Sequence, residues 1–487
     1  MQHSRRPAAN VDSFMAITWI VAGLFTVALV TAAELPADVQ HLAGLAASLP
    51  PEFQADALLK IVESHGGLEP ALKKDLLEQA ATLARQASQA YQKVSAHGVA
   101  ADTRQAFQSS ALALKLDRLS LEMRAVRDML PFDPIGARQL YQQTSKPAPL
   151  NGACRELLIP QLDDYYDIGA QVVSRGFTSK EINRQDHVAL LLHILASARA
   201  PNEVAPAARM LTSANLATQQ FEAGLNAFTA RLESISPDNR SFSETAIASQ
   251  QEIGTLADRA FALGVPRGTL ARAYRKYLTS NYGAPRCDDS AGARIAGTPH
   301  TSAVDWFNQS DLRGDLSLIE MKDLTGNKDP NGKVQINVFW STPDSENILT
   351  AAQRLRTSPS GVFYSVQERS STEWNQKRQD FLAQLNDWKQ SGDESELDFF
   401  NQKATVYQSL IDLCPSGEGR QGMVNAFVDF LKSSNVAASA PVDWFWHAQN
   451  MYRRLRQSGD SDASKLMSAY RVSGNLMLEV YAQFNPH

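Results

Sequence analysis

Apolar side chains recur every three to four residues along most of this chain, in segments that end at short breaks containing Gly or Pro. This spacing places the apolar residues on one face of an α-helix. One segment begins at Pro51 and ends before Gly66, and the next begins at Pro70. Helices joined by such short loops pack antiparallel against their neighbours. We therefore predict an all-α fold, an irregular α-α superhelix of stacked helical hairpins.

The helical pattern divides the chain into successive blocks. Further helices are expected from about Asp102 to Pro131 and from Pro134 to Gln143, before a Pro-rich break. A chain of this length is expected to form two to three core-forming units. The predicted divisions are N-terminal helical hairpins at 34–150, a central helical block at 151–290, an irregular linker or insertion at 291–370, and C-terminal helical hairpins at 371–487.

Residues 316–340 show the clearest β signal in the chain. Polar and apolar residues alternate over Val334–Val338, which is typical of a half-buried strand. Leu316–Met321 is a candidate partner, and the Asp-Pro-Asn-Gly sequence ending at Gly332 is a candidate turn. A small β-hairpin insertion is therefore predicted near 316–340.

The first 33 residues have the pattern of an export signal. Arg5 and Arg6 precede an uncharged apolar stretch over residues 14–30, and small residues follow up to Ala33. A secretory signal needs these three parts in this order. Cleavage after Ala33 is predicted, which makes the mature protein periplasmic or secreted in a bacterium. The alternative is an uncleaved N-terminal helix that anchors the chain, because the apolar stretch approaches the length that spans a bilayer.

Charge and composition exclude some classes of partner. The formal net charge is −5, and both signs are interspersed along the chain. Nucleic-acid binding would require a basic patch or stripe, which is not present. A basic amphipathic face for peripheral membrane binding is not present either. No nucleic-acid partner is predicted, and no membrane contact once the signal is removed.

Three cysteines permit at most one internal disulfide bond in an exported protein. Cys154 and Cys287 follow Pro-containing turns at the two ends of the central helical block, so a bond between them would join those ends. We predict this pair and a leftover thiol at Cys414. The alternative is three unpaired thiols that pack as small hydrophobic groups. No metal site and no cofactor is predicted, because no two cysteines have a ligand-like spacing.

Two motifs have simpler structural interpretations. Gly417–Gly422 matches a dinucleotide-binding fingerprint by letter, but the preceding residues are helical in pattern, whereas the fingerprint requires a strand. A turn between two helices is the preferred interpretation. His187 and His193 are six residues apart, which places them on opposite sides of a helix and argues against a shared metal site.

The distribution of tryptophan permits two functional hypotheses, a binding surface and an enzyme cleft. Six of the seven tryptophans lie at or beyond Trp306, and the candidate binding aromatics are Trp306, Trp388, Trp444 and Trp446. Exposed aromatic rings suit peptide or sugar binding, although packing between helices is the commoner role. A rival hypothesis is a glycan-directed enzyme on an α/α fold, with Asp163, Asp305 or Asp443 in a Trp-lined acidic cleft.

No motif for a catalytic residue is found in the sequence. The leading hypothesis is a non-enzymatic exported scaffold whose stacked helices bind another extracytoplasmic protein or a peptide. The glycan-directed enzyme is the alternative. The sequence does not determine the oligomeric state.

Overall fold

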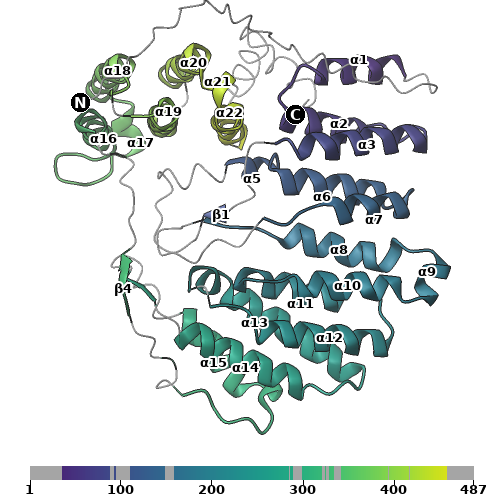
Figure 1. Ribbon diagram of the computed structural model, residues 1–487. Coiled ribbons are helices and arrows are strands. Elements are labelled where there is room, and N and C mark those ends of the chain that lie inside the picture. The colour runs from purple at the N-terminus through teal and green to yellow at the C-terminus, as the bar shows by residue number, and fades with distance from the viewer. Residues whose placement is uncertain are drawn as a thin grey trace, which may run out of the picture.

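The computed structural model confirms the all-α fold. It describes residues 36–87, 93–94, 110–147, 158–237, 239–283, 286–288, 299–320, 324, 328–333, 340, 342–392, 394–415 and 417–457. Within these residues, helices form an N-terminal array and a C-terminal block (Figure 1). None of the described helices is both long and apolar enough to cross a membrane.

The N-terminal array stacks helices in successive layers from α1 to α15 (Figure 1). Its α-helices are α1 (Ala37–Ala46), α2 (Pro51–Ser64), α3 (Pro70–Ala84), α5 (Ser110–Leu114), α6 (Arg118–Met129), α7 (Pro134–Gln143), α8 (Asp163–Arg175), α9 (Ser179–Asn183), α10 (Asp186–Ala196), α11 (Val204–Ser213), α12 (Thr218–Leu232), α13 (Asn239–Ala262), α14 (Gly268–Gly283) and α15 (Pro299–Gln309). The array also contains the short 3-10 helices η1 (Pro201–Glu203) and η2 (Asp311–Arg313).

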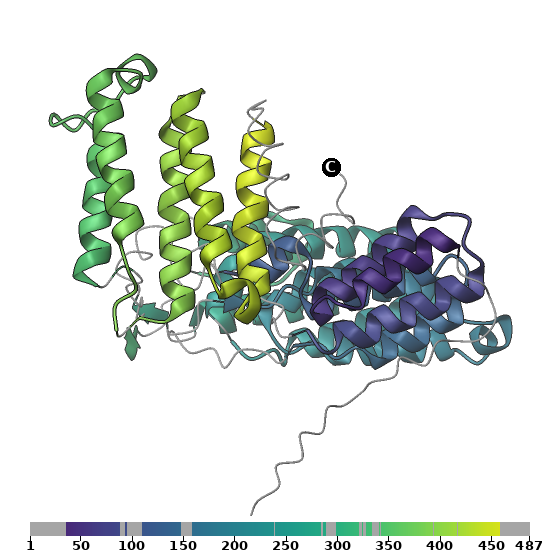
Figure 2. The same cartoon turned by 90° about the horizontal axis from the view of Figure 1, so that it is seen from above.

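The C-terminal block contains α16 (Pro343–Arg356), α17 (Val366–Arg369), α18 (Thr372–Asp387), α19 (Glu396–Leu413), α20 (Glu418–Ser433), α21 (Val436–Ser439) and α22 (Pro441–Gln457). Its long helices stand side by side, and their axes cross those of the array (Figure 2). α20 follows α19 through a turn that contains Gly417. The rest of the Gly417–Gly422 stretch, which was expected to be a turn, forms the start of α20, so the stretch joins two helices and not a strand and a helix.

Several helix boundaries follow from local capping. Pro51, Pro70 and Pro134 each occupy the first turn of a helix, where the missing N–H removes no hydrogen bond. Asp133 caps α7, because its carboxylate accepts a hydrogen bond from the Gly136 N–H at 2.9 Å. These starts agree with the periodicity and proline positions in the sequence.

The helix expected from about Asp102 to Pro131 is interrupted in the structure. Residues 101–109 lie outside the described part, and the rest divides into α5 and α6. Lys115 adopts a positive φ of 59°, which ends α5. Asp117 then starts α6 by accepting a hydrogen bond from the Ser120 N–H at 3.0 Å. The hydrogen bond from the Ser120 N–H to the Asp117 side chain favours a new helix start at this position over one continuous helix. The periodicity of apolar residues did not reveal this break.

The hairpin predicted near 316–340 takes a different form. The segment predicted to contain its turn belongs to strand β4 (Lys328–Lys333), which pairs in parallel with β3 (Arg286–Asp288). Residues 316–320 form no strand, because the Asn308 side chain satisfies the backbone of Ile319 at both its N–H and its C=O, at 2.9 and 3.0 Å. Val334–Val338 lies outside the described residues. A second short pair joins β1 (Lys93–Val94) to β2 (Leu158–Ile159) in antiparallel orientation.

Burial defines two hydrophobic cores. One extends from Val39 to Leu324, and the other from Trp340 to Leu455. The boundary expected at 150/151 therefore falls within a single core. The segment 291–370, which was expected to be an irregular linker, includes α15, α16 and α17. The clusters of Gly, Pro and Asn in this segment led to the expectation of irregular structure. α22 connects the two units, since Val442 belongs to the first core.

Candidate functional site

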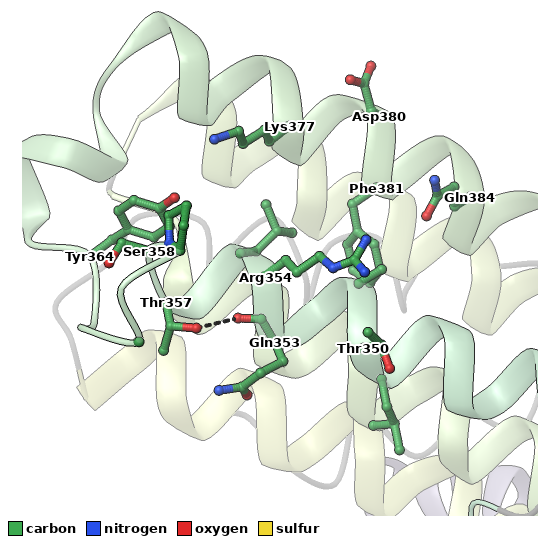
Figure 3. A pocket seen from close by; sticks show the side chains of 15 residues that line it. Thr350, Gln353, Arg354, Thr357, Ser358, Tyr364, Lys377, Asp380, Phe381 and Gln384 are labelled. Atoms are coloured by element: carbon green, nitrogen blue, oxygen red, sulfur yellow. Dashed lines mark hydrogen bonds between the residues drawn. The ribbon is translucent and has the colours of Figure 1, made fainter.

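A groove of about 930 Å³ lies between α16 and α18 in the C-terminal block (Figure 3). Fifteen residues line it. Thr350, Gln353 and Arg354 come from α16, and Lys377, Asp380, Phe381 and Gln384 come from α18. The segment that leaves α16 contributes Thr357, Ser358 and Tyr364 at one end. The volume lies in the range of about 300–1,000 Å³ that is typical of ligand sites.

The base of the groove is rigid because its apolar side chains belong to the core. Leu355 and Phe381 line the groove and are almost fully buried. The Trp374 indole N–H donates a hydrogen bond to the Leu355 carbonyl at 3.1 Å, which ties the end of α16 to α18. Ser371 caps α18 by accepting a hydrogen bond from the Trp374 N–H at 3.2 Å.

The chain between α16 and α17 folds back as a short β-hairpin at the end of the groove. The Ser358 N–H donates to the Val362 carbonyl at 2.8 Å, and the Tyr364 N–H donates to the Arg356 carbonyl at 3.0 Å. Gly361 has a φ of 80°, in the left-handed region that glycine adopts at little cost. The arrangement is the three-residue hairpin loop that ends with a left-handed residue.

The hairpin and the start of α17 expose three apolar side chains close together in sequence. Val362 is 65% exposed, Phe363 is 74% exposed, and Val366 at the start of α17 is 62% exposed. An isolated apolar side chain on a surface is ordinary, whereas a cluster of them beside a groove is typical of an interaction site. We call these three residues the apolar rim.

One cation in the groove is not neutralised. Lys377 pairs with Glu373 at 2.7 Å, and this hydrogen bond raises the pKa of the lysine. Asp380 accepts a hydrogen bond from the Gln376 amide at 2.9 Å. Arg354 has neither a hydrogen-bond nor an ion-pair partner among the residues that the structure describes. Its guanidinium is therefore available to an incoming carboxylate.

A second cleft, of about 600 Å³, lies in the N-terminal array and is lined by α7, α8, α9 and α10. Arg138 pairs with Glu181 at 2.9 Å and lies 4.4 Å from the centre of the Phe177 ring. The hydrogen bond from Arg138 lowers the pKa of Glu181 to about 2. Tyr141 and Tyr165 stack at 5.0 Å in its wall. These charged groups are already paired, so the cleft offers little free charge to a ligand.

His193 lines the second cleft, whereas His187 is buried and packs against Phe177 at 6.1 Å. The two histidines are not brought together. No group of three or more His, Cys, Asp or Glu side chains in the described ranges is placed to hold a metal ion.

A buried Lys–Tyr–Glu cluster resembles catalytic chemistry but is closed. The Lys146 ammonium donates to the Glu203 carboxylate, to the Tyr166 hydroxyl at 3.2 Å and to the Ser197 carbonyl at 2.9 Å. Glu203 also accepts from the Arg199 N–H at 2.7 Å. Burial lowers the pKa of Lys146 and raises that of Tyr166 well above its usual value. All three ammonium donors are used, so the cluster ties the segment after α7 to α8 and to η1.

A second buried polar group lies in the C-terminal block. Gln408 donates hydrogen bonds to His447, at 3.2 Å to Nδ1 and at 3.0 Å to its carbonyl. His447 Nε2 is 2.9 Å from the Asn401 carbonyl oxygen. Nε2 therefore carries the proton that it donates to Asn401, and Nδ1 is the unprotonated nitrogen that accepts from Gln408. This pattern requires the neutral ring. Burial lowers the pKa of His447 to about 3, so its role is structural at neutral pH.

The four candidate tryptophans pack between helices. Trp444 is 1% exposed and its indole N–H donates to the Leu431 carbonyl at 2.9 Å. Trp388 is buried against Phe399. Trp306 packs against the N-terminal core, and Trp446 packs against the C-terminal core. None of the four lines the groove, whose aromatic residues are Tyr364 and Phe381.

The three candidate carboxylates lie on α8, α15 and α22, which are separate helices (Figure 1). Asp163 on α8 pairs with Arg209 at 2.5 Å. Asp443 on α22 accepts a hydrogen bond from Ser110, and Asp305 is exposed on α15. They do not meet in either of the two clefts described above.

The predicted disulfide and signal cleavage stay predictions. Cys154 and Ala33 lie outside the described residues, as does the side chain of Cys287 in β3. Cys414 is unpaired and buried, and burial raises the pKa of its thiol.

The apolar rim was not found by the sequence analysis. The sequence Ser-Pro-Ser-Gly at 358–361 is a turn signal, which could have revealed the hairpin. No local pattern indicates that Val362 and Phe363 are exposed, because exposure depends on which helices pack nearby.

No protein-family model, no curated protein and no solved structure that was compared with this chain matches it.

Proposed function

We propose that this chain is an exported, non-enzymatic helical scaffold that binds a peptide segment of another extracytoplasmic protein in the groove between α16 and α18. The observation that carries the proposal is the apolar rim beside that groove. Val362, Phe363 and Val366 are each more than 60% exposed, although all three are apolar. Covering one large apolar side chain contributes about 1.5–3 kcal/mol to binding before ordering costs are subtracted.

The size of the site favours a peptide over a folded partner. Fifteen residues line the groove, whereas a standard interface between two folded proteins uses about 20–30 residues on each side. A groove with a rigid apolar base and polar walls suits a short segment that places one or two side chains inside it.

The extracytoplasmic location belongs to the same proposal and depends on the leader at residues 13–33. The uncharged stretch, the two preceding arginines and the small residues up to Ala33 support export and cleavage. If the leader is retained, the same groove is presented by a membrane-anchored chain. N-terminal sequencing of the exported protein tests this, and a mature chain that begins near Glu34 supports cleavage.

Cross-linking of the full chain in its own cell envelope tests the binding site. A photoreactive amino acid at Val362 is expected to capture a partner that mass spectrometry identifies reproducibly. Replacing the rim aromatic by Phe363→Ser is expected to abolish that capture.

Phe261→Ser is a matched control, because Phe261 is 71% exposed on α13 and does not line the groove. This variant is expected to capture the partner as well as the unmodified chain does. Equal capture by both serine variants would contradict the proposal.

A further inference from the structure

We propose that the bound peptide is extended and acidic: it pairs as a β-strand with the outer edge of the hairpin at Phe363 and places a carboxylate on Arg354. This inference rests on the proposed function and names the kind of segment that the groove accepts. Three observations carry it, namely the free strand edge, the apolar rim and the unpaired guanidinium.

The hairpin has a free edge at Phe363. The hydrogen bonds within the hairpin use the backbone of its two neighbours, Val362 and Tyr364. In an antiparallel pair, hydrogen-bonding residues alternate along each strand, so the N–H and C=O of Phe363 point away from the opposite strand. The Phe363 N–H has no hydrogen bond to any residue that the structure describes. Such an edge is a template for an incoming strand.

The side chains at this edge favour a peptide with apolar residues. A strand that pairs with Phe363 places a side chain opposite it, at about 4.5–5.5 Å between Cβ atoms. Phe363 and Val362 are among the most exposed apolar residues of the described chain. A β-branched or aromatic residue of the peptide opposite Phe363 would cover that ring. Val362 is the next residue on the strand, so its side chain points to the other face. Alternate residues of the peptide strand face the other way, which leaves them free for polar contacts.

The charges around the groove favour an acidic peptide. Arg354 in the groove and Arg356 at the end of α16 both lack an ion-pair partner within the described residues. Two carboxylates nearby keep their negative charge, because their hydrogen-bond donors are neutral: Asp380 accepts from the Gln376 amide, and Glu368 accepts from the Ser365 N–H at 2.7 Å. The positive charge that favours a carboxylate is therefore local to Arg354 and Arg356. A guanidinium binds a carboxylate through two parallel hydrogen bonds, so an Asp or Glu of the peptide complements Arg354.

Binding of defined peptides to the purified full chain tests the inference. The probe is a short fluorescein-labelled peptide in which valine and aspartate alternate, measured by fluorescence anisotropy. Two matched peptides replace aspartate by lysine or carry N-methyl groups on the central amides, which removes strand donors. Each change is expected to weaken binding by about tenfold or more. Arg354→Glu is expected to reverse the preference between the aspartate and lysine peptides.

Other results would overturn the inference. Equal binding of the N-methylated peptide would exclude strand pairing, and an unchanged preference in Arg354→Glu would exclude the carboxylate contact. The absence of saturable binding up to about 1 mM peptide would also overturn it. The proposed function is tested separately by partner capture. Suppose that Phe363→Ser abolishes partner capture while the three peptides bind with equal affinity. The groove is then supported as a binding site, and recognition of an extended acidic peptide is contradicted.

Discussion

The Ser110 hydroxyl donates a hydrogen bond to the Asp443 carboxylate at 3.3 Å, although 333 residues separate the two. The contact joins α5 of the array to α22 of the C-terminal block. Close by, Phe53 and Phe445 meet edge to face with their ring centres 5.6 Å apart. α22 therefore fixes the C-terminal block, and with it the groove, to the N-terminal array.

Asp443→Asn is expected to stabilise the protein at pH 8. Burial raises the pKa of Asp443 to about 6, so the folded state favours the protonated acid. Its contribution to stability is present at low pH and is lost as the pH rises from about 4 to 6. The asparagine amide removes the buried charge, and its carbonyl oxygen still accepts the hydrogen bond from Ser110. This predicts a gain in unfolding free energy of about 1–3 kcal/mol at pH 8, and about half of that gain at pH 5. Urea unfolding at both pH values measures this difference.

Asp412→Asn provides the comparison, because Asp412 is exposed and pairs with Arg454 at 2.6 Å. Loss of an exposed pair is expected to cost about 0–1 kcal/mol. A gain at pH 8 of the same size in both variants would show that general charge reduction, and not burial of Asp443, is the cause.

His447 is expected to make the protein sensitive to acid. Its pKa is lowered to about 3 by burial, so the unfolded state binds a proton at a higher pH than the folded state does. The contribution of the neutral ring is complete above about pH 6.5 and is lost as the pH falls toward 3. In an Asp443→Asn background, the urea midpoint should fall between pH 7 and pH 4. Adding His447→Gln should make the urea midpoint less dependent on pH. If the midpoint changes with pH as steeply as in Asp443→Asn alone, His447 is not the source of the acid sensitivity.

Lys146→Met is expected to be strongly destabilising, because it leaves the carboxylate of Glu203 buried without its ammonium partner. Removal of one member of a buried ion pair costs about 3–5 kcal/mol. The double variant Lys146→Met with Glu203→Leu should recover a large part of this loss, since neither charge remains. Thermal unfolding of the two single variants and the double variant gives the coupling energy. Additive effects would mean that the two groups do not interact.

Gly361→Ala is expected to weaken partner capture without unfolding the C-terminal block. An alanine at a φ of 80° costs about 1 kcal/mol, which destabilises the hairpin locally. Hydrogen exchange at the Tyr364 amide should become faster, because that amide closes the hairpin. Gly392→Ala is the control, since Gly392 has an ordinary φ and open space around it. Unchanged exchange in Gly361→Ala would contradict the hairpin geometry.

Local signals in the sequence predicted the helices where capping and periodicity agree. The start of α2 at Pro51 and the full extent of α7 at Pro134–Gln143 follow from such signals. The same signals failed at Lys115, whose positive φ divides a stretch that is helical in pattern. They also failed over residues 316–320, where Asn308 replaces a partner strand.

The sequence by itself determined the helical class of this protein, because the spacing of apolar residues and the positions of Pro and Gly act over a few residues. Only the tertiary structure decided that Trp388 and Trp444 are buried while Val362 and Phe363 are exposed. Burial depends on which distant helix covers a side chain, as the contact between Ser110 and Asp443 illustrates. Such contacts join residues hundreds of positions apart, so no local pattern predicts them, and the groove that they position is invisible in the sequence.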